Sequence, residues 1–233
     1  EGELASHLVG KGRMEEPDKI IEVLEDFFSA QKDLEKKKIL ITAGPTYEKI
    51  DPVRFIGNYS SGKMGFALAE ACAERGAEVT LVAGPVSLKT HHPAIKRIDV
   101  ESAGEMYQAA MTAFPSSDAA ILCAAVADYR LENASEQKIK RETEREMTLH
   151  LVPNPDIAAS LGAIKREGQV MVGFALETND EATHAEGKLK RKNLDFIVLN
   201  SLRDQGAGFR CDTNKITIID RAEAVSYPLK RKQ

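Results

Sequence analysis

The sequence predicts an α/β fold of the Rossmann-like type, with a mainly parallel sheet, helices on both faces and a small C-terminal β-hairpin or flap region. Two observations support this fold class. Strand-like and helix-like patterns alternate along the 233 residues, which is the order that βαβ units produce. The run 118–125 is almost wholly apolar, as expected for a central strand that helices cover on both sides.

The first unit joins a strand to a helix through a long polar loop. The apolar run 38–42 predicts a strand, and helical spacing resumes at Met64, Leu68 and Cys72. The loop ends in Ser60-Ser61-Gly62, directly before that helix. Small residues at a helix N-terminus leave backbone N–H groups accessible, and the helix dipole favours an anion there. We therefore expect this loop to bind an anionic ligand.

The loop matches neither of two common nucleotide-binding signatures. Residues 57–63 fit the Walker A spacing G-x-x-x-x-G-K, but Met64 stands where that motif requires Ser or Thr, and Met has no hydroxyl for magnesium. The dinucleotide fingerprint G-x-G-x-x-G is absent from the sequence, which disfavours an NAD(P)-dependent oxidoreductase. The loop is expected to bind its anion in another way.

The next elements continue the sheet in βαβ order. Residues 78–83 and 96–100 predict strands. Ser102 is a candidate N-cap for a helix that ends near residues 114–115. The central strand then leads directly into residues 126–130, at the carboxyl end of the sheet, where open α/β folds bind ligands.

Residues 131–145 form a polar, highly charged run with two possible interpretations. A solvent-exposed loop is the default for such a run. The run follows the strand end that is expected to face a ligand, however, so a mobile flap that carries Lys138 could also close over phosphate groups. The sequence leaves both interpretations open.

The rest of the chain predicts three strands, two helices and a hairpin. Pro155 is expected at the first position of a short helix. A second helix from about residue 180 carries a cluster of cations in its last turns, where the helix dipole favours them. The expected strands are residues 147–152, 169–175 and 195–199, and the hairpin pairs residues 215–220 with 224–229.

Composition argues against several classes of protein. The formal net charge is −4, and Lys and Arg are spread through the sequence, so no nucleic-acid partner is expected. No apolar run approaches the roughly 20 residues of a membrane-spanning helix, so no membrane association is expected. Cys72, Cys123 and Cys211 lack metal-ligand spacing and are expected to be reduced thiols of a cytoplasmic protein. The sequence identifies no metal ligands.

Eight ordered sequence blocks carry a resemblance to a known family. They are ITAGPT, DPVRFIGNYSSGKMG, VTLVAGPVSL, CAAVADYR, KIKRE, NPDI, VGFALET and KRKNLD. Together they resemble phosphopantothenoylcysteine synthetase, also called phosphopantothenate–cysteine ligase, in its bacterial form. In bacteria this synthetase is usually the C-terminal half of a bifunctional coenzyme A biosynthesis protein, fused behind a flavin-dependent phosphopantothenoylcysteine decarboxylase.

The resemblance implies a ligase that joins 4′-phosphopantothenate to L-cysteine, with CTP and Mg²⁺ and through an acyl-cytidylate, and that releases CMP and pyrophosphate. It also implies a homodimer, with higher assembly through the fused decarboxylase domain. Both steps develop charge on oxygen, so the site needs cations near the triphosphate and N–H donors near the acyl carbonyl, and no protein nucleophile is required. Two alternatives are an NAD(P)-dependent oxidoreductase of Rossmann type and a noncatalytic interaction domain on the same fold.

The N-terminal segment is expected to be a separate unit. Residues 1–21, with GKGRMEEP, resemble the end of the decarboxylase, but Ala5-Ser6-His7 stands where that family has Ala-Cys-Gly with its proton-donating cysteine. We therefore expect a decarboxylase remnant with a linker helix over residues 19–31, together spanning residues 1–36, without decarboxylase activity. The synthetase domain is expected over residues 37–233.

The resemblance also assigns site residues by position. Asn58 is the amide that handles the acyl-cytidylate, and Lys138 is the flap lysine that meets the triphosphate. Phe174 is placed against the pyrimidine, a contact that suits an aromatic ring. The remaining nucleotide contacts that the resemblance implies are Leu122, Cys123, Ala124, Asp128, Pro155, Asp156, Ile157, Ala158, Lys188 and Lys192.

Further candidates follow from residue chemistry together with the substrates that the resemblance implies. A guanidinium grips a phosphate through two parallel hydrogen bonds, so Arg54 is a candidate for the phosphate of the pantothenate substrate. Ser60, Ser61 and Gly62 are candidates for anion contacts at the helix N-terminus. The sequence does not decide the preference for CTP over ATP, the metal ligands or the segment that forms the dimer interface.

Overall fold

The computed structural model describes most of the 233-residue chain, namely residues 2–3, 9–10, 14–30, 32–140, 146–177, 187–201 and 213–231. Four predicted features fall wholly or partly outside these residues. They are Ala5-Ser6-His7 of the expected decarboxylase remnant, residues 141–145 of the polar run, the start of the helix expected from residue 180, and Cys211.

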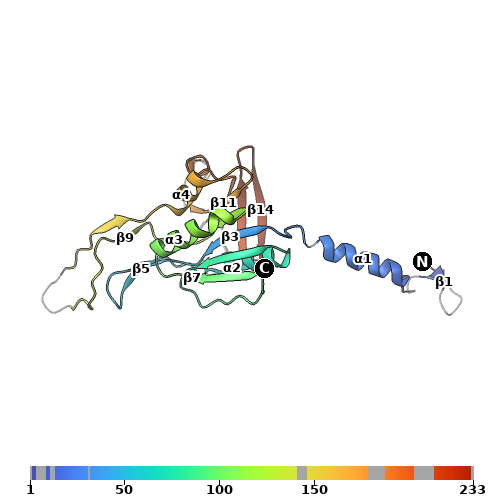
Figure 1. The fold of residues 1–233 in the computed structure, drawn as a ribbon, viewed down its shortest axis with the longest axis horizontal. Helices are drawn as coiled ribbons and strands as arrows, with labels where there is room; N and C mark the ends of the chain where they lie inside the picture. The colour runs from blue at the N-terminus through green and yellow to red at the C-terminus, as the bar shows by residue number, and fades with distance from the viewer. Residues whose placement is uncertain are drawn as a thin grey trace.

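An eight-stranded sheet forms the centre of the molecule (Figure 1), in the order β14-β13-β12-β11-β8-β3-β6-β7. The strands from β12 to β7 are parallel, and β13 and β14 add an antiparallel hairpin at one edge. This arrangement confirms the predicted fold class. The strands are β3 Lys38–Ala43, β6 Glu78–Ala83, β7 Ile95–Asp99, β8 Ala119–Leu122, β11 Val170–Glu177, β12 Phe196–Ser201, β13 Thr213–Ile219 and β14 Ala224–Arg231.

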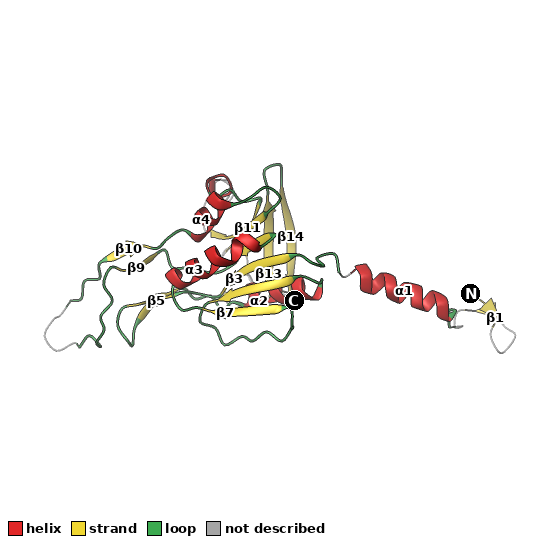
Figure 2. Cartoon of the chain, viewed as in Figure 1, coloured by secondary structure: helices red, strands yellow, loops and turns green. Residues whose placement is uncertain are grey.

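Helices cover both faces of the sheet (Figure 2) because the strands alternate their side chains between two apolar layers. Leu40 of β3 belongs to one buried cluster, together with Met106 and Leu161 from two of the helices. The next residue of the strand, Ile41, belongs to a second cluster with Phe66 from a third helix. The helices are α2 Lys63–Glu74, α3 Ala103–Ala113 and α4 Ile157–Ile164, with a 3-10 turn η1 at Phe114–Ser116, and residues 187–191 are also helical.

The predicted N-cap of α3 is confirmed. The Ser102 side chain accepts a hydrogen bond from the Glu105 N–H, and the Glu105 carboxylate accepts one from the Ser102 N–H, so the two residues form a capping box. The prediction for α4 was wrong by two residues. Asp156 is its N-cap and accepts a hydrogen bond from the Ala159 N–H, which leaves Pro155 one residue before the cap.

Two predicted strands are shorter than expected. The run 118–125 forms the central strand β8 only over Ala119–Leu122, because pairing with β11 ends at Leu122. Beyond it, the N–H groups of Cys123 and Ala125 still donate to the Thr42 and Gly44 carbonyls on the other side. The prediction for the run 147–152 was wrong over residues 147–150, since only Leu151–Pro153 forms a strand, β10. The strand that pairs with β10 is β9, Tyr129–Leu131, which has only three residues. Residues 146–150 lie beyond the end of β9 and therefore do not continue the strand.

Two two-stranded ribbons extend beyond the carboxyl ends of the parallel strands (Figure 1). One consists of β4 Tyr47–Lys49 and β5 Phe55–Gly57, and the other consists of β9 and β10. Hydrogen bonds join the polar segment after β9 to the turn of the first ribbon, from Ser135 N–H to the Ile50 carbonyl at 2.9 Å and from Ile139 N–H to the Asp51 carboxylate at 3.1 Å.

The N-terminal segment extends away from the sheet in Figure 1. It contains the short strands β1 Gly2–Glu3 and β2 Val9–Gly10 and the helix α1 Pro17–Ala30, close to the predicted linker helix. The chain joins the body of the fold at Leu34, whose N–H donates to the Arg75 carbonyl at 3.0 Å. The domain boundary after residue 36 stays a prediction. None of the helices that the structure describes is long and apolar enough to cross a bilayer.

Candidate functional site

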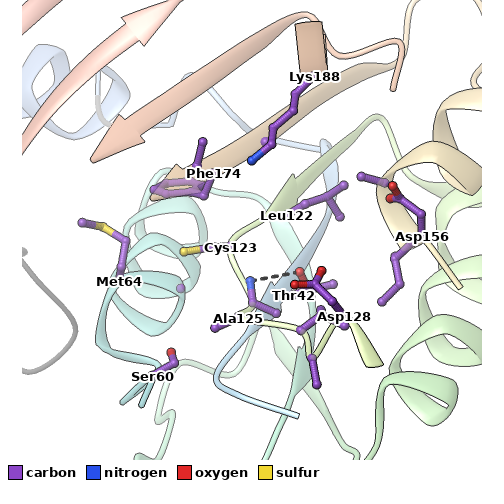
Figure 3. A pocket seen from close by; sticks show the side chains of 18 of the residues that line it. Thr42, Ser60, Met64, Leu122, Cys123, Ala125, Asp128, Asp156, Phe174 and Lys188 are labelled. Carbon is purple, nitrogen blue, oxygen red and sulfur yellow. Dashed lines mark hydrogen bonds between the residues drawn. The ribbon is translucent and has the colours of Figure 1, made fainter. Parts of the chain in front are cut away.

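A cavity of about 690 Å³ opens at the carboxyl ends of β3, β8 and β11. Parallel strands present their loops and helix N-termini at this end of a sheet. Segments that are far apart in the sequence line the cavity (Figure 3), with Met64 and Cys123 on one side and Asp156 on the other. The cavity therefore has three walls, which come from the start of α2, the segment after β8 and the start of α4.

The first wall is the N-terminus of α2. Its N-cap, Gly62, has a φ of 77°, a left-handed angle that glycine adopts readily, and no described side chain caps the helix. A methyl group on Gly65 would lie 2.5 Å from the Ala43 methyl carbon, so a glycine is needed for α2 to lie this close to β3. The N–H groups of an uncapped first turn border the cavity, in the place where the sequence predicts an anion site.

The second wall is the backbone of residues 123–128, which polar side chains from three other segments hold in place. Each of these side chains bonds a backbone group that has left the ladder of the sheet. The bonds run from Ala124 N–H to Thr42 Oγ1 at 3.4 Å, from Ala127 N–H to Thr46 Oγ1 at 2.9 Å, from Asn58 Nδ2 to the Ala125 and Val126 carbonyls at 3.0 and 3.2 Å, and from Asn154 Nδ2 to the Ala127 carbonyl at 2.9 Å.

The third wall combines the start of α4 with cations of the helix at residues 187–191 and just after it. The Lys192 ammonium lies 3.0 Å from the Asp156 carboxylate, which joins the two elements. Partial burial alone would raise the pKa of Asp156, but hydrogen bonds from the Ala159 N–H and from Lys192 outweigh it and lower this pKa. Asp156 is therefore an anion at neutral pH, and Lys188 adds a second cation to the cavity lining.

The structure brings most of the predicted site residues together in this one cavity. The exceptions are Arg54, Asn58 and Lys138, which lie outside its lining. The predicted residues that line it are Ser60, Ser61, Gly62, Leu122, Cys123, Ala124, Asp128, Pro155, Asp156, Ile157, Ala158, Phe174, Lys188 and Lys192. Their individual roles stay predictions.

Arg54 contacts the polar segment after β9, residues 132–140, which is called the flap below, outside the lining of the cavity. The Arg54 guanidinium pairs with the buried carboxylate of Asp51 and donates a hydrogen bond to the Ile139 carbonyl at 2.8 Å. The hydrogen bond from Arg54 holds the pKa of Asp51 well below its ordinary value. Arg54 therefore ties the β4–β5 ribbon to the flap, and Lys138, next to Ile139, has an exposed side chain. A role of Arg54 in phosphate binding stays a prediction.

Several lining residues were not found by sequence reasoning. Asn154 lines the cavity between the second and third walls. Asn214 of β13 is buried, and its Nδ2 donates to Asn200 Oδ1 of β12 at 3.1 Å, so the two amides form a polar pair at the cavity. A polar residue that interrupts an apolar strand pattern is the signal that could have marked this pair.

Comparisons with known proteins identify a family and several relatives. The DNA/pantothenate metabolism flavoprotein C-terminal domain family matches residues 34–233. A protein named cysteine/cysteine sulfinic acid decarboxylase, from an unidentified prokaryote, is 56% identical over 99% of this chain and 66% of its own length. The coenzyme A biosynthesis bifunctional protein CoaBC of Vibrio parahaemolyticus is 49% identical over 99% of this chain. The chain spans 60% of the length of that protein, so it covers less than two thirds of both relatives.

Among solved structures, the C-terminal domain of a coenzyme A biosynthesis bifunctional protein CoaBC has a TM-score of 0.72 and 39% sequence identity. The similarity covers 86% of this chain and 90% of that domain. The resemblance drawn from the eight sequence blocks is thereby confirmed at the level of the family. Because the family match spans nearly the whole described sheet and cavity, the chain belongs to the DNA/pantothenate metabolism flavoprotein C-terminal domain family.

Proposed function

We propose that this chain is a phosphopantothenate–cysteine ligase of coenzyme A biosynthesis, which uses CTP to join 4′-phosphopantothenate to L-cysteine. The observation that carries the proposal is the convergence of four separate segments on one cavity. These segments are residues 122–128, residues 155–158, Phe174 and residues 188–192, and each contains residues that the resemblance assigns to the nucleotide. Membership of the family supports the same conclusion.

In the first step, a carboxylate oxygen of 4′-phosphopantothenate attacks the α-phosphorus of CTP. A new P–O bond forms, the bond to the bridging oxygen breaks, and pyrophosphate leaves with the electron pair. The cavity suits the triphosphate because Lys188 and Lys192 contribute positive charge to its lining, and the first turn of α2 contributes backbone N–H groups. Phe174 offers an aromatic face for the base.

In the second step, the cysteine amine attacks the acyl carbon. The bond from that carbon to the cytidylate oxygen breaks, CMP leaves with the electron pair, and one N–H proton passes to solvent. The resemblance assigns the acyl-cytidylate to Asn58. Its Nδ2 already donates to the Ala125 and Val126 carbonyls, so a contact with the intermediate requires that one of these hydrogen bonds be exchanged.

The reaction also implies Mg²⁺, and the residues of the cavity are compatible with it. Mg²⁺ usually binds one or two carboxylates together with substrate phosphates rather than a complete protein cage. The described residues contain no cluster of three or more metal-ligating side chains, but Asp128 lines the cavity and can provide a single carboxylate. When bound, Mg²⁺ would supply positive charge to the triphosphate oxygens.

The test is a reaction with purified chain, 4′-phosphopantothenate, L-cysteine, CTP and Mg²⁺, followed by mass spectrometry and pyrophosphate detection. Phosphopantothenoylcysteine, CMP and pyrophosphate are the expected products. Release of CDP and phosphate would indicate an acyl phosphate and contradict the cytidylate route, and equal use of ATP would contradict the preference for CTP. Because one relative is named a decarboxylase, release of CO₂ from L-cysteine, cysteine sulfinic acid and phosphopantothenoylcysteine is measured in parallel and is expected to be absent.

Two further measurements address the alternatives and the assembly. CTP is expected to raise the melting temperature where NADPH does not, since a ligand at 100 times its Kd stabilises a protein by about 2.7 kcal/mol. The opposite result would favour the oxidoreductase. The resemblance also implies a homodimer, which sedimentation of the purified chain tests directly.

A further inference from the structure

Asn154 lies at the junction between the second and third walls of the cavity. Its backbone N–H donates to the Asp128 carbonyl at 2.8 Å, and its side-chain Nδ2 donates to the Ala127 carbonyl at 2.9 Å. One residue thus makes two hydrogen bonds to successive carbonyls of the segment after β8. These two hydrogen bonds therefore hold residue 154 at a defined distance from the segment after β8.

The residues that follow Asn154 in the chain belong to the third wall. Pro155 follows it with a restricted φ angle, and Asp156 is the N-cap of α4. Few rotatable bonds separate the Asn154 amide from the first turn of the helix. Any shift of Asn154 relative to Ala127 would therefore move the start of α4 relative to Asp128.

An amide suits this position better than other side chains. The Asn154 Oδ1 accepts a hydrogen bond from Arg130 Nη1 at 3.4 Å, and the same Arg130 nitrogen donates to the Pro153 carbonyl at 2.6 Å. The amide therefore accepts on the side of Arg130 and donates on the side of Ala127. An aspartate could not donate to the Ala127 carbonyl, and an apolar side chain could do neither.

We propose that Asn154 is a positioning residue that sets the spacing between the two nucleotide-binding walls of the cavity. It acts through the segment it holds, which includes Asp128, and through the start of α4. The proposal rests on the proposed function for its nucleotide, CTP. Loss of the Asn154 amide should weaken nucleotide binding and leave the chemical step nearly intact, because Asn58, which the resemblance assigns to the acyl group, keeps its own hydrogen bonds to the Ala125 and Val126 carbonyls.

The chain offers a matched control for this residue. Gln169 also uses an amide to hold two backbone carbonyls next to β8, with Nε2 at 3.1 Å from the Phe114 carbonyl and 2.7 Å from the Ser117 carbonyl. These carbonyls precede β8, at the end of the strand away from the cavity. Substitution of Gln169 thus removes the same kind of hydrogen bond without touching either cavity wall.

The experiment compares Asn154→Ala with Gln169→Met in steady-state kinetics. Asn154→Ala is expected to raise the KM for CTP about tenfold, the loss typical of one net hydrogen bond, with kcat changed less than about threefold. Arg130→Met, which removes the donor to the Asn154 amide oxygen and to the Pro153 carbonyl but keeps the Asn154 bonds to the segment after β8, should raise this KM to a smaller extent. Gln169→Met should lower the melting temperature and leave this KM unchanged. An unchanged KM in Asn154→Ala, or an equal rise in Gln169→Met, would overturn the proposal.

A double-mutant cycle separates positioning from direct contact. If Asn154 acts through Asp128, Asn154→Ala should change the KM by less than about twofold in an Asp128→Ala background. An equal change in both backgrounds would show that Asn154 does not act through Asp128 and would overturn this part of the proposal. If the wild-type chain forms no product, the proposed function fails. The Kd for CTP, measured by calorimetry, then replaces the KM: it should rise about tenfold in Asn154→Ala and stay unchanged in Gln169→Met. No binding of CTP by the wild type would overturn both proposals.

Discussion

The two ends of the central strand β8 use similar hydrogen bonds for different purposes. At its amino end, the Asp118 carboxylate accepts a hydrogen bond from the Lys38 N–H at 2.7 Å, and the Gln169 amide holds two loop carbonyls. At its carboxyl end, the amides of Asn58 and Asn154 also hold loop carbonyls. The bonded groups are of the same kind, but only the carboxyl end borders the cavity of about 690 Å³.

The two ends of β8 differ in whether a cavity lies beside these hydrogen bonds. At the amino end, side chains close the sheet against its own loops, as when Asp195 accepts from both Lys165 and the Met171 N–H. At the carboxyl end, the side chains fix the backbone of residues 123–128 as one wall of a cavity that the start of α4 also lines. We infer that changes at the amino end alter stability, whereas changes at the carboxyl end alter ligand binding and chemistry.

The largest effect is expected from Asn58→Asp. The change places a carboxylate against the Ala125 and Val126 carbonyls and removes an amide donor from the acyl group, so product formation should fall on the order of 100-fold. Attack by cysteine should suffer more than formation of the acyl-cytidylate, which should accumulate in quenched-flow samples. Asn133→Asp, on the exposed part of the flap, is the control. Normal turnover in Asn58→Asp would remove Asn58 from the site.

The next largest effect is expected from Lys138→Gln. This change removes the flap cation while it keeps length and polarity, so release of pyrophosphate should fall about tenfold or more with or without cysteine. Rapid-quench measurement of pyrophosphate tests this expectation, with Lys140→Gln as the neighbouring control. Accumulation of acyl-cytidylate in Lys138→Gln would instead reverse the roles assigned to Lys138 and Asn58.

At the other end of β8, Gln169→Met should change stability alone. Loss of the amide leaves the Phe114 and Ser117 carbonyls without this donor, so the free energy of unfolding should fall by about 1–3 kcal/mol. Urea unfolding measures this change, and the ligase rate at a temperature well below the melting point should equal that of the wild type. A loss of activity in the folded variant would contradict the separation of the two ends.

The smallest effect is expected from the pH dependence of Asp156. Its pKa in the folded state is lowered, so its contribution to stability is present above the ordinary value of 3.8 and is lost as the pH falls below it. Asp156→Asn keeps a good N-cap but removes this titration. Stability from urea unfolding should therefore depend less on pH between neutral and acidic buffers in the variant. An identical pH dependence in the two proteins would contradict the assignment.

Much of the fold could be predicted from local patterns. The strand at residues 78–83 matches β6, and the predicted cap of α3 at Ser102 is present with its Glu105 partner. These features depend on periodicity and on contacts within one turn of chain, which a short stretch of sequence contains. The strand predicted at residues 147–152 failed because its length depends on its partner, β9, which has only three residues.

For the candidate site, too, some features could be predicted from the sequence and others could not. The ordered blocks were sufficient to identify the family and to nominate residues such as Phe174 and Lys192, which line one cavity. They did not indicate that Arg54 is engaged by Asp51, or that Asn154 spans two walls. A polar residue in an apolar strand pattern could have marked Asn214, but the sequence did not indicate its pairing with Asn200, because the two amides come from different strands.

By itself, the sequence determined the fold class, the order of the strand and helix units and the family. Side-chain periodicity and helix capping depend on residues a few positions apart, so the chain alone carries that information. Only the tertiary structure decided which polar groups are paired and which border the cavity. The Asn154 amide and the Ala127 carbonyl are 27 residues apart and meet at 2.9 Å only because the sheet, the β9–β10 ribbon and α4 pack together.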